Sequence, residues 1–214
     1  MRTERPGRRN AVSRWFRRAA SPEKLISTYG IAVVLALLGE PAVAGPARFE
    51  RETITIQVKP GGIRVEGQYT FTSAAPTPVS QTVYYPFPID SLHPLVDSVS
   101  VRIGGSDIEY KKAPMGIGFT VPIAAAGSTT VVVSYYHGSL DNTACYILTS
   151  TEAWNAPLKE ARFEVHVPDS LELVDSSFDF DSVATQGSGR VHRFTQSDFM
   201  PENDLCIRWR PVKH

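Results

Sequence analysis

The sequence predicts an all-β protein, an antiparallel β-sandwich of about a dozen strands with an immunoglobulin-like general architecture. Three observations predict it. Apolar and polar residues alternate in short runs from Phe49 onward, turn residues recur roughly every eight to twelve positions, and no segment has a convincing amphipathic helical pattern. With 214 residues and 42% hydrophobic content, the chain is long enough to bury a substantial core.

The first 44 residues differ in composition from the rest and predict an export signal. They carry eight Lys or Arg and three Asp or Glu, and they contain the apolar run Ile31–Leu38, the helix breaker Pro41 and the small-x-small sequence Ala42-Val43-Ala44. This order is typical of a secretory signal peptide, and we expect cleavage after Ala44. A retained signal anchor is the alternative, although the apolar run is shorter than the about 20 residues of a membrane span.

Residues 45–214 form the exported part, which we expect to be a single β-sandwich domain; two lobes divided near residues 138–143 are the alternative. This part carries fourteen basic and nineteen acidic side chains, so it lacks the clustered basic face that binds nucleic acid. No later stretch is apolar enough to cross a membrane. The sequence therefore predicts an extracytoplasmic protein, periplasmic or secreted, with no membrane span after signal cleavage and no nucleic-acid partner.

The first two strands are predicted to form a hairpin. Ile54, Ile56 and Val58 alternate with polar residues, and after a turn at 59–62 the alternation resumes from Ile63 to Phe71. Polar residues fill the other positions of the second strand. This pattern predicts an antiparallel pair with one face toward the core and one face toward water.

Further strands are expected along the middle of the chain. Their predicted positions are 79–85, 99–103 in a hairpin with 108–110, and 117–121, with a proline-rich irregular segment at 86–94. The run 129–136 places Val131, Val132 and Val133 in succession, which predicts a central strand buried on both faces.

Residues 145–168 are interpreted as two strands joined by a connection that carries Trp154, and this connection is the one place where a helical turn is expected. Strands at 171–174, 191–194 and 205–210 complete the chain. In the last strand, Leu205, Ile207 and Trp209 share one face, so Cys206 is expected on the less buried face or under a covering loop.

Cys145 and Cys206 are the only two cysteines. In an oxidising compartment they are predicted to form a disulfide, and two free buried thiols are the alternative. A redox site is the least favoured interpretation, because the chain has no C-x-x-C pair.

Several motifs lie in the C-terminal third, at Tyr146–Thr151, Trp154, Pro157–Leu158, Phe163–Pro168 and Phe199–Leu205. In their order they resemble an uncharacterised family of bacterial exported domains of unknown function, in which Tyr-x-Leu-Thr-Thr, a Trp before Pro-Ile or Pro-Leu, and Phe-x-Pro-x-x-Asp-Leu recur. Ser150 stands where the family has threonine. The resemblance implies an exported β-sandwich and brings no catalytic residues. Residues 84–88 and 99–104 have a fainter similarity to the vault/inter-alpha-trypsin domain, at the level of the fold alone.

No residue pattern marks a catalytic or metal site, and no cofactor is expected. The five histidines stand singly, without zinc-ligand spacing. Asp175, Asp179 and Asp181 lack the glycine and terminal glutamate of an ordered calcium loop. Gly187-Ser188-Gly189 lacks the outer positions of a nucleophile elbow. A pair of carboxylates assembled by the fold for glycoside hydrolysis stays open as an alternative.

Aromatic residues are the better indication of function. Tyr84, Tyr85 and Phe87, framed by two prolines and close in sequence to His93, form the candidate binding surface; packing of the rings into the core is the alternative. We therefore predict a non-enzymatic binding or interaction module of the bacterial envelope, with a protein or a surface polymer as partner. An envelope hydrolase with an acidic cleft and a structural component of a cell-surface assembly are the alternatives. No pattern indicates an oligomeric state.

Overall fold

The computed structural model describes residues 47–94 and 96–213, so the predicted signal peptide and its cleavage site lie outside the described residues. The described chain folds into strands and one short helix. In order, these are β1 (Ala47–Lys59), β2 (Gly62–Ser73), β3 (Val79–Pro86), β4 (Asp97–Ile103), β5 (Ser106–Asp107), β6 (Lys111–Ala113), β7 (Gly116–Ile123), β8 (Ser128–Gly138), β9 (Thr143–Tyr146), the 3-10 helix η1 (Thr149–Trp154), β10 (Leu158–Pro168), β11 (Leu171–Ser176), β12 (Ser182–Thr185), β13 (Gly189–Phe199) and β14 (Leu205–Pro211).

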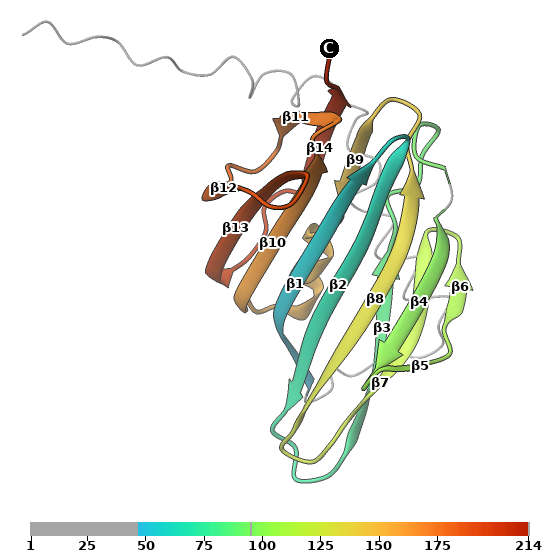
Figure 1. The fold of residues 1–214 in the computed structure, drawn as a ribbon. Helices are drawn as coiled ribbons and strands as arrows, with labels where there is room; N and C mark the ends of the chain where they lie inside the picture. Colours follow the sequence, from blue (N-terminus) through green and yellow to red (C-terminus); the bar gives the residue numbers. More distant parts are fainter. Residues whose placement is uncertain (1–46, 95, 214) are drawn as a thin grey trace, which may run out of the picture. The chain divides into compact units, whose positions relative to one another are not determined.

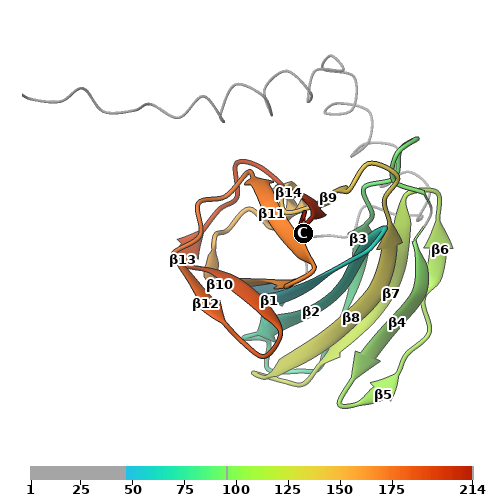
Figure 2. The same cartoon turned by 45° about the horizontal axis from the view of Figure 1, so that its top comes forward.

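The strands form three sheets, which confirms the predicted all-β sandwich. The long sheet has eight strands in the order β12-β13-β10-β1-β2-β8-β4-β5, and the two short sheets have the orders β11-β14-β9 and β3-β7-β6. Tyr69 of the long sheet contacts both Tyr85 of β3 and Tyr146 of β9, so both short sheets pack on the same face of the long one. Figures 1 and 2 show this arrangement from two directions.

The β1–β2 hairpin follows the predicted alternation. Ile54, Ile56 and Val58 are buried on β1, opposite buried positions of β2. The pairing is interrupted by a bulge between Phe49 and Arg51, which brings Phe49 to the same face as the buried even-numbered positions.

One pair departs from the antiparallel prediction, because β1 and β10 run parallel. A parallel neighbour requires a long crossover between the two strands. Here the whole segment from β2 to η1 lies between them in sequence, and most of it builds the neighbouring strands and the second layer. The long sheet thus contains strands from both sides of residues 138–143.

The strand predicted as central, β8, does lie inside the long sheet, between β2 and β4. Its burial on both faces was predicted incorrectly. Val131 and Val133 are fully buried, whereas Val132 is only half-buried, because the second layer covers one face of this part of the sheet.

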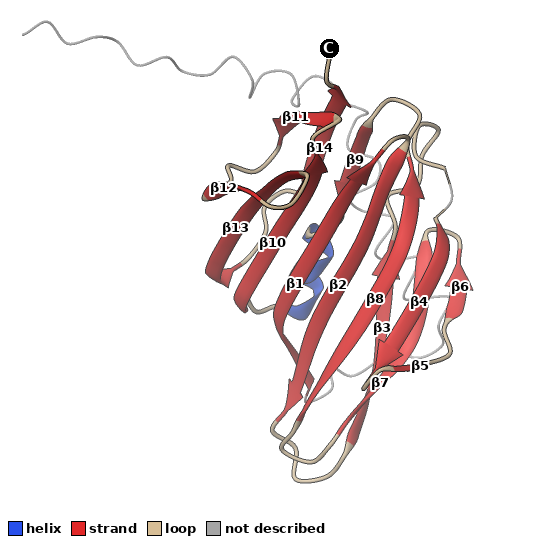
Figure 3. Ribbon diagram, viewed as in Figure 1, coloured by secondary structure: helices blue, strands red, loops and turns tan. Residues whose placement is uncertain are grey.

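The two strands predicted on either side of Trp154 are present as β9 and β10, but they do not pair with each other. β9 pairs with β14, while β10 pairs with β1 and β13, so the two strands belong to different sheets. The connection between them contains η1, which confirms the predicted helical turn; Figure 3 shows it in blue beside β1. The expected second strand at 108–110 is replaced by the two-residue β5. Among the described residues, no helix is long and apolar enough to cross a membrane.

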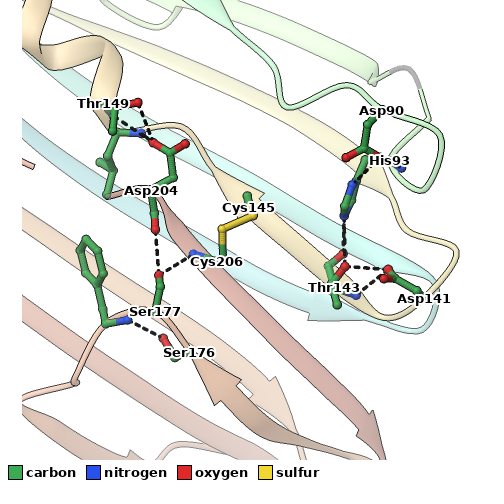
Figure 4. Close-up of a disulfide and its surroundings, with 12 residues drawn as sticks. Asp90, His93, Asp141, Thr143, Cys145, Thr149, Ser176, Ser177, Asp204 and Cys206 are labelled. Atoms are coloured by element: carbon green, nitrogen blue, oxygen red, sulfur yellow. Dashed lines mark hydrogen bonds and ion pairs between the residues drawn. A yellow bond between two sulfur atoms is a disulfide. The ribbon is translucent and has the colours of Figure 1, made fainter. Parts of the chain in front are cut away.

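The predicted disulfide is present. Cys145 and Cys206 stand directly opposite each other in the β9–β14 pair and are bonded (Figure 4). On β14, Leu205, Ile207 and Trp209 are buried and the cysteine lies on the other face, as expected.

Candidate functional site

The four residues of the predicted binding surface do not form an exposed patch, and that prediction is corrected. Tyr85 is 8% exposed, Phe87 4% and His93 8%, while Tyr84 is half-buried. Alternate side chains of β3 and its extension face the long sheet, where the Tyr85 and Phe87 rings pack on Tyr135 with centroids 6.1 and 5.0 Å away. The rings therefore complete the core, which was the alternative interpretation.

His93 connects the loop after β3 to the start of β9. Its Nδ1 lies 2.8 Å from Asp90 Oδ1, and its Nε2 lies 3.2 Å from the carbonyl and hydroxyl oxygens of Thr143. The Thr143 hydroxyl donates to Asp141 Oδ1 at 2.6 Å. Figure 4 shows this chain of contacts. Because the hydroxyl proton is directed to a carboxylate and away from the imidazole, the cluster fastens the loop to β9 and does not activate a nucleophile.

The three sheets meet at a set of tyrosine hydroxyl groups. Tyr69 of β2 is hydrogen-bonded through its hydroxyl to that of Tyr85 on β3 and to that of Tyr146 on β9, each at 2.8 Å. All three side chains are buried, and burial raises the pKa of each phenol well above its usual 10. These neutral hydroxyl groups keep unused lone pairs, so the junction is polar inside an otherwise apolar core.

Glu52 of β1 lies next to this junction. Its position continues the inward-facing series of Ile54 and Ile56, and it pairs with Tyr69 on β2 and with Ala161 on β10. Glu52 is 3% exposed, and its Oε1 atom has no hydrogen-bond partner. Burial without a compensating charge raises the pKa of the carboxyl from 4.5 to about 8, so the group is mostly uncharged at neutral pH.

A cavity of about 50 Å³ adjoins the carboxyl, and we call it the junction pocket. Eight of its fourteen lining residues are aromatic, and Glu52 supplies the only carboxyl group among them. Tyr69, Tyr85 and Tyr146 line it from the three sheets. Such a volume accommodates about three water molecules, or a ligand group of similar size.

The helix η1 forms one wall of the pocket, through Ser150, Thr151 and Trp154. The Trp154 ring packs on Phe49 and Phe71, with centroids 5.9 and 5.4 Å away. Because Ser150 is exposed and Trp154 half-buried, this wall reaches from the core to solvent.

Asp204 holds the start of η1. Its Oδ1 atom accepts hydrogen bonds from the backbone N–H groups of Leu148 and Thr149, at 2.8 and 3.0 Å, and from the Thr149 hydroxyl at 3.0 Å (Figure 4). The segment Phe199–Leu205 thus contacts the segment Tyr146–Thr151, and together they position the wall of the junction pocket. These are two of the motifs that the sequence singled out.

The side chains that line the junction pocket limit which reactions it could catalyse. Glu52 is the only carboxyl group among the residues that line the pocket. No group of three metal-ligating side chains occurs in the described part of the chain. The pocket offers one ionisable acid, hydroxyl groups and aromatic faces, which suit recognition of a ligand better than hydrolysis by two carboxylates.

Sequence reasoning missed Glu52, although a signal was present. The alternation Ile54, Ile56, Val58 extends backward by one step to Glu52, which places a carboxyl on the buried face. An ionisable residue in phase with a core pattern is a candidate site residue for that reason.

No protein-family model matches the chain, and no curated protein matches it. The fold does occur in solved structures. A putative nutrient binding protein from Legionella pneumophila superposes with a TM-score of 0.66 at 14% identity, over 79% of this chain and 68% of that one. An M1 zinc metallopeptidase from Deinococcus radiodurans superposes with a TM-score of 0.49 at 12% identity over 77% of this chain. This chain corresponds to 42% of the length of that peptidase. The superposition with the Legionella protein shows that the two chains share a fold.

Proposed function

We propose that this protein is a non-enzymatic, extracytoplasmic binding module that recognises a small ligand group in the junction pocket. The observation that carries the proposal is the Glu52 carboxyl, which is buried among aromatic rings, faces a cavity and has an oxygen without a partner. An isolated buried carboxyl destabilises a fold, whereas an apolar side chain of similar size would stabilise it. Such a group fits a role in binding.

Four further observations support this class of function. The N-terminal segment has the pattern of a secretory signal peptide, and the disulfide fits an oxidising compartment. The Legionella protein that shares the fold is named as a putative nutrient binding protein, which is a function of the same class. Glu52 is the only carboxyl group in the lining of the junction pocket, whereas hydrolysis by two carboxylates needs a second one there.

A thermal-shift screen with the full chain tests the proposal. The library contains small cations, neutral molecules and anions, and the variants are Glu52→Gln and the matched control Glu66→Gln, whose carboxylate is exposed on β2. At about one hundred times Kd, a ligand stabilises by about 2.7 kcal/mol, which corresponds to a shift of roughly 5 to 10 °C for a domain of this size. The shift should persist in Glu66→Gln and fall in Glu52→Gln.

A different combination of results would contradict the proposal. If no compound of any class stabilises the protein, while a stable partner co-purifies from envelope extracts, the protein is a structural or protein-binding component instead. Location is tested separately by fractionation and by N-terminal sequencing of the exported product, which is expected to begin at Gly45.

A further inference from the structure

The junction pocket has an unusual combination of one acid, many aromatic faces and no basic side chain. An anionic ligand would meet the Glu52 carboxyl without a compensating Lys, Arg or His among the lining residues. A hard metal ion such as calcium needs six to eight oxygen ligands, and the described residues contain no cluster of metal-ligating side chains. The remaining charged class is an organic cation.

We propose that the junction pocket binds the ammonium group of a small primary amine, with Glu52 as its counter-ion. This inference rests on the proposed binding function and names its ligand class. An ammonium group has three N–H donors, and the pocket offers acceptors for them at the unpartnered Glu52 Oε1 and at the linked hydroxyl oxygens of Tyr69 and Tyr146. The surrounding rings attract the cation through their π faces.

The size of the cavity favours a small amine over a bulkier cation. About 50 Å³ accommodates an ammonium group with one or two carbon atoms, whereas the four methyl groups of tetramethylammonium need more space. The lining reaches solvent at the exposed Ser150 and at the half-buried Tyr84, Ile147 and Trp154, so a longer substituent would leave the cavity past these side chains. We therefore expect a free amine to fit better than a lysine side chain carried by a protein.

Binding of an ammonium ion requires the ionised carboxylate, so it should be coupled to proton release. Glu52 holds its proton up to about pH 8. The other titratable groups that line the pocket are Tyr69 of β2, Tyr84 and Tyr85 of β3, and Tyr146 of β9; the pKa of each is raised by burial, so all keep their protons in this range. Helix η1 and β7 contribute no titratable side chain to the lining. Affinity should thus rise about tenfold per pH unit below pH 8 and level off above it.

Isothermal titration calorimetry of the full chain tests this inference, in amine-free buffers at about pH 6, 7 and 8. The probes are ethylammonium, the neutral analogue ethanol, acetate, tetramethylammonium and Nα-acetyl-lysine amide. We expect ethylammonium to bind most tightly, with about one proton released per molecule bound at pH 7. Glu52→Gln should weaken its binding at least tenfold at pH 8, whereas Glu66→Gln should leave it unchanged.

Other outcomes overturn the inference in distinguishable ways. Ethanol or acetate binding as tightly as ethylammonium would reject the cation class and leave the binding function intact. Tighter binding of the lysine derivative would assign the pocket to a protein partner. If no probe and no library compound binds, the proposed function fails as well. Circular dichroism verifies the fold of Glu52→Gln; if that variant is unfolded, the pH dependence and proton release of the unmodified protein decide, and a pH-independent affinity would reject the role of Glu52.

Discussion

In the unmodified protein, we expect the free energy of unfolding to fall as the pH rises, because the buried Glu52 carboxyl keeps its proton in the folded protein and ionises in the unfolded chain. In the Glu52→Gln variant, we expect this contribution to the fall to be absent. Glutamine has nearly the same shape as glutamate and carries no ionisable proton. The variant therefore removes the titration at this position while it leaves the size of the buried side chain almost unchanged. Titrations elsewhere in the protein contribute equally to both proteins and cancel in the difference.

The magnitude follows from the burial of the carboxyl. Its pKa is 4.5 in an unfolded chain and about 8 in the folded protein. Below pH 4.5 both states hold the proton, so the contribution is constant. Between pH 4.5 and 8 only the folded state holds it, and unfolding becomes easier by about 1.4 kcal/mol per pH unit. The total loss is on the order of 5 kcal/mol, and it ends above pH 8, where both states are ionised.

Urea unfolding at closely spaced pH values across this interval measures the effect. The unmodified protein and Glu66→Gln should show the same slope, because Glu66 is exposed and its ion pair with Arg102, at 3.5 Å, lies on the surface. The difference between the unmodified protein and Glu52→Gln should change steadily between about pH 5 and 8. Parallel curves for these two proteins would refute a buried, protonated Glu52.

Three further predictions concern the elements that hold the pocket together. Replacing both Cys145 and Cys206 with alanine should lower stability by about 4 kcal/mol in chemical denaturation, since the bond closes a loop of 61 residues; equal midpoints would contradict this. Asp204→Ala should cost about 1 to 2 kcal/mol and speed amide exchange at the start of η1, whereas the exposed neighbour Glu202→Ala should do neither. Gly67→Ala should lower the free energy of unfolding by at least about 2 kcal/mol, because the added Cβ atom would overlap the Tyr69 hydroxyl, which two hydrogen bonds hold in place. Unchanged stability would show that the Tyr69 ring moves freely.

Local patterns in the sequence were sufficient for much of the fold. Alternation on β1, β2 and β14 identified their buried faces, because a side-chain period of two is a property of each strand alone. The disulfide followed from the count of two cysteines and the export signal. The parallel placement of β10 beside β1 did not follow, because the pairing of two strands separated by the 98 residues 60–157 depends on the whole topology.

The sequence identified some residues of the candidate site, but not how they are arranged. Tyr85 and Phe87 were identified as important aromatic residues, but their side of the sheet depends on the second layer, which the local sequence does not specify. The tyrosine junction joins positions 69, 85 and 146, three residues that only the packing of three sheets brings together. The burial of Glu52 could have been predicted, because it lies two residues before Ile54 and so on the same face of the strand.

The most direct test of the account is the carbon NMR signal of the Glu52 side-chain carboxyl, assigned by its loss in Glu52→Gln. At pH 7 a pKa of about 8 leaves roughly nine in ten carboxyl groups protonated, so the signal of the free protein should lie near the position of a neutral acid. Saturating ethylammonium should move it to the position of an ionised carboxylate. A signal that is already ionised in the free protein, or one that ethylammonium does not move, would contradict the proposed role of Glu52 in the junction pocket.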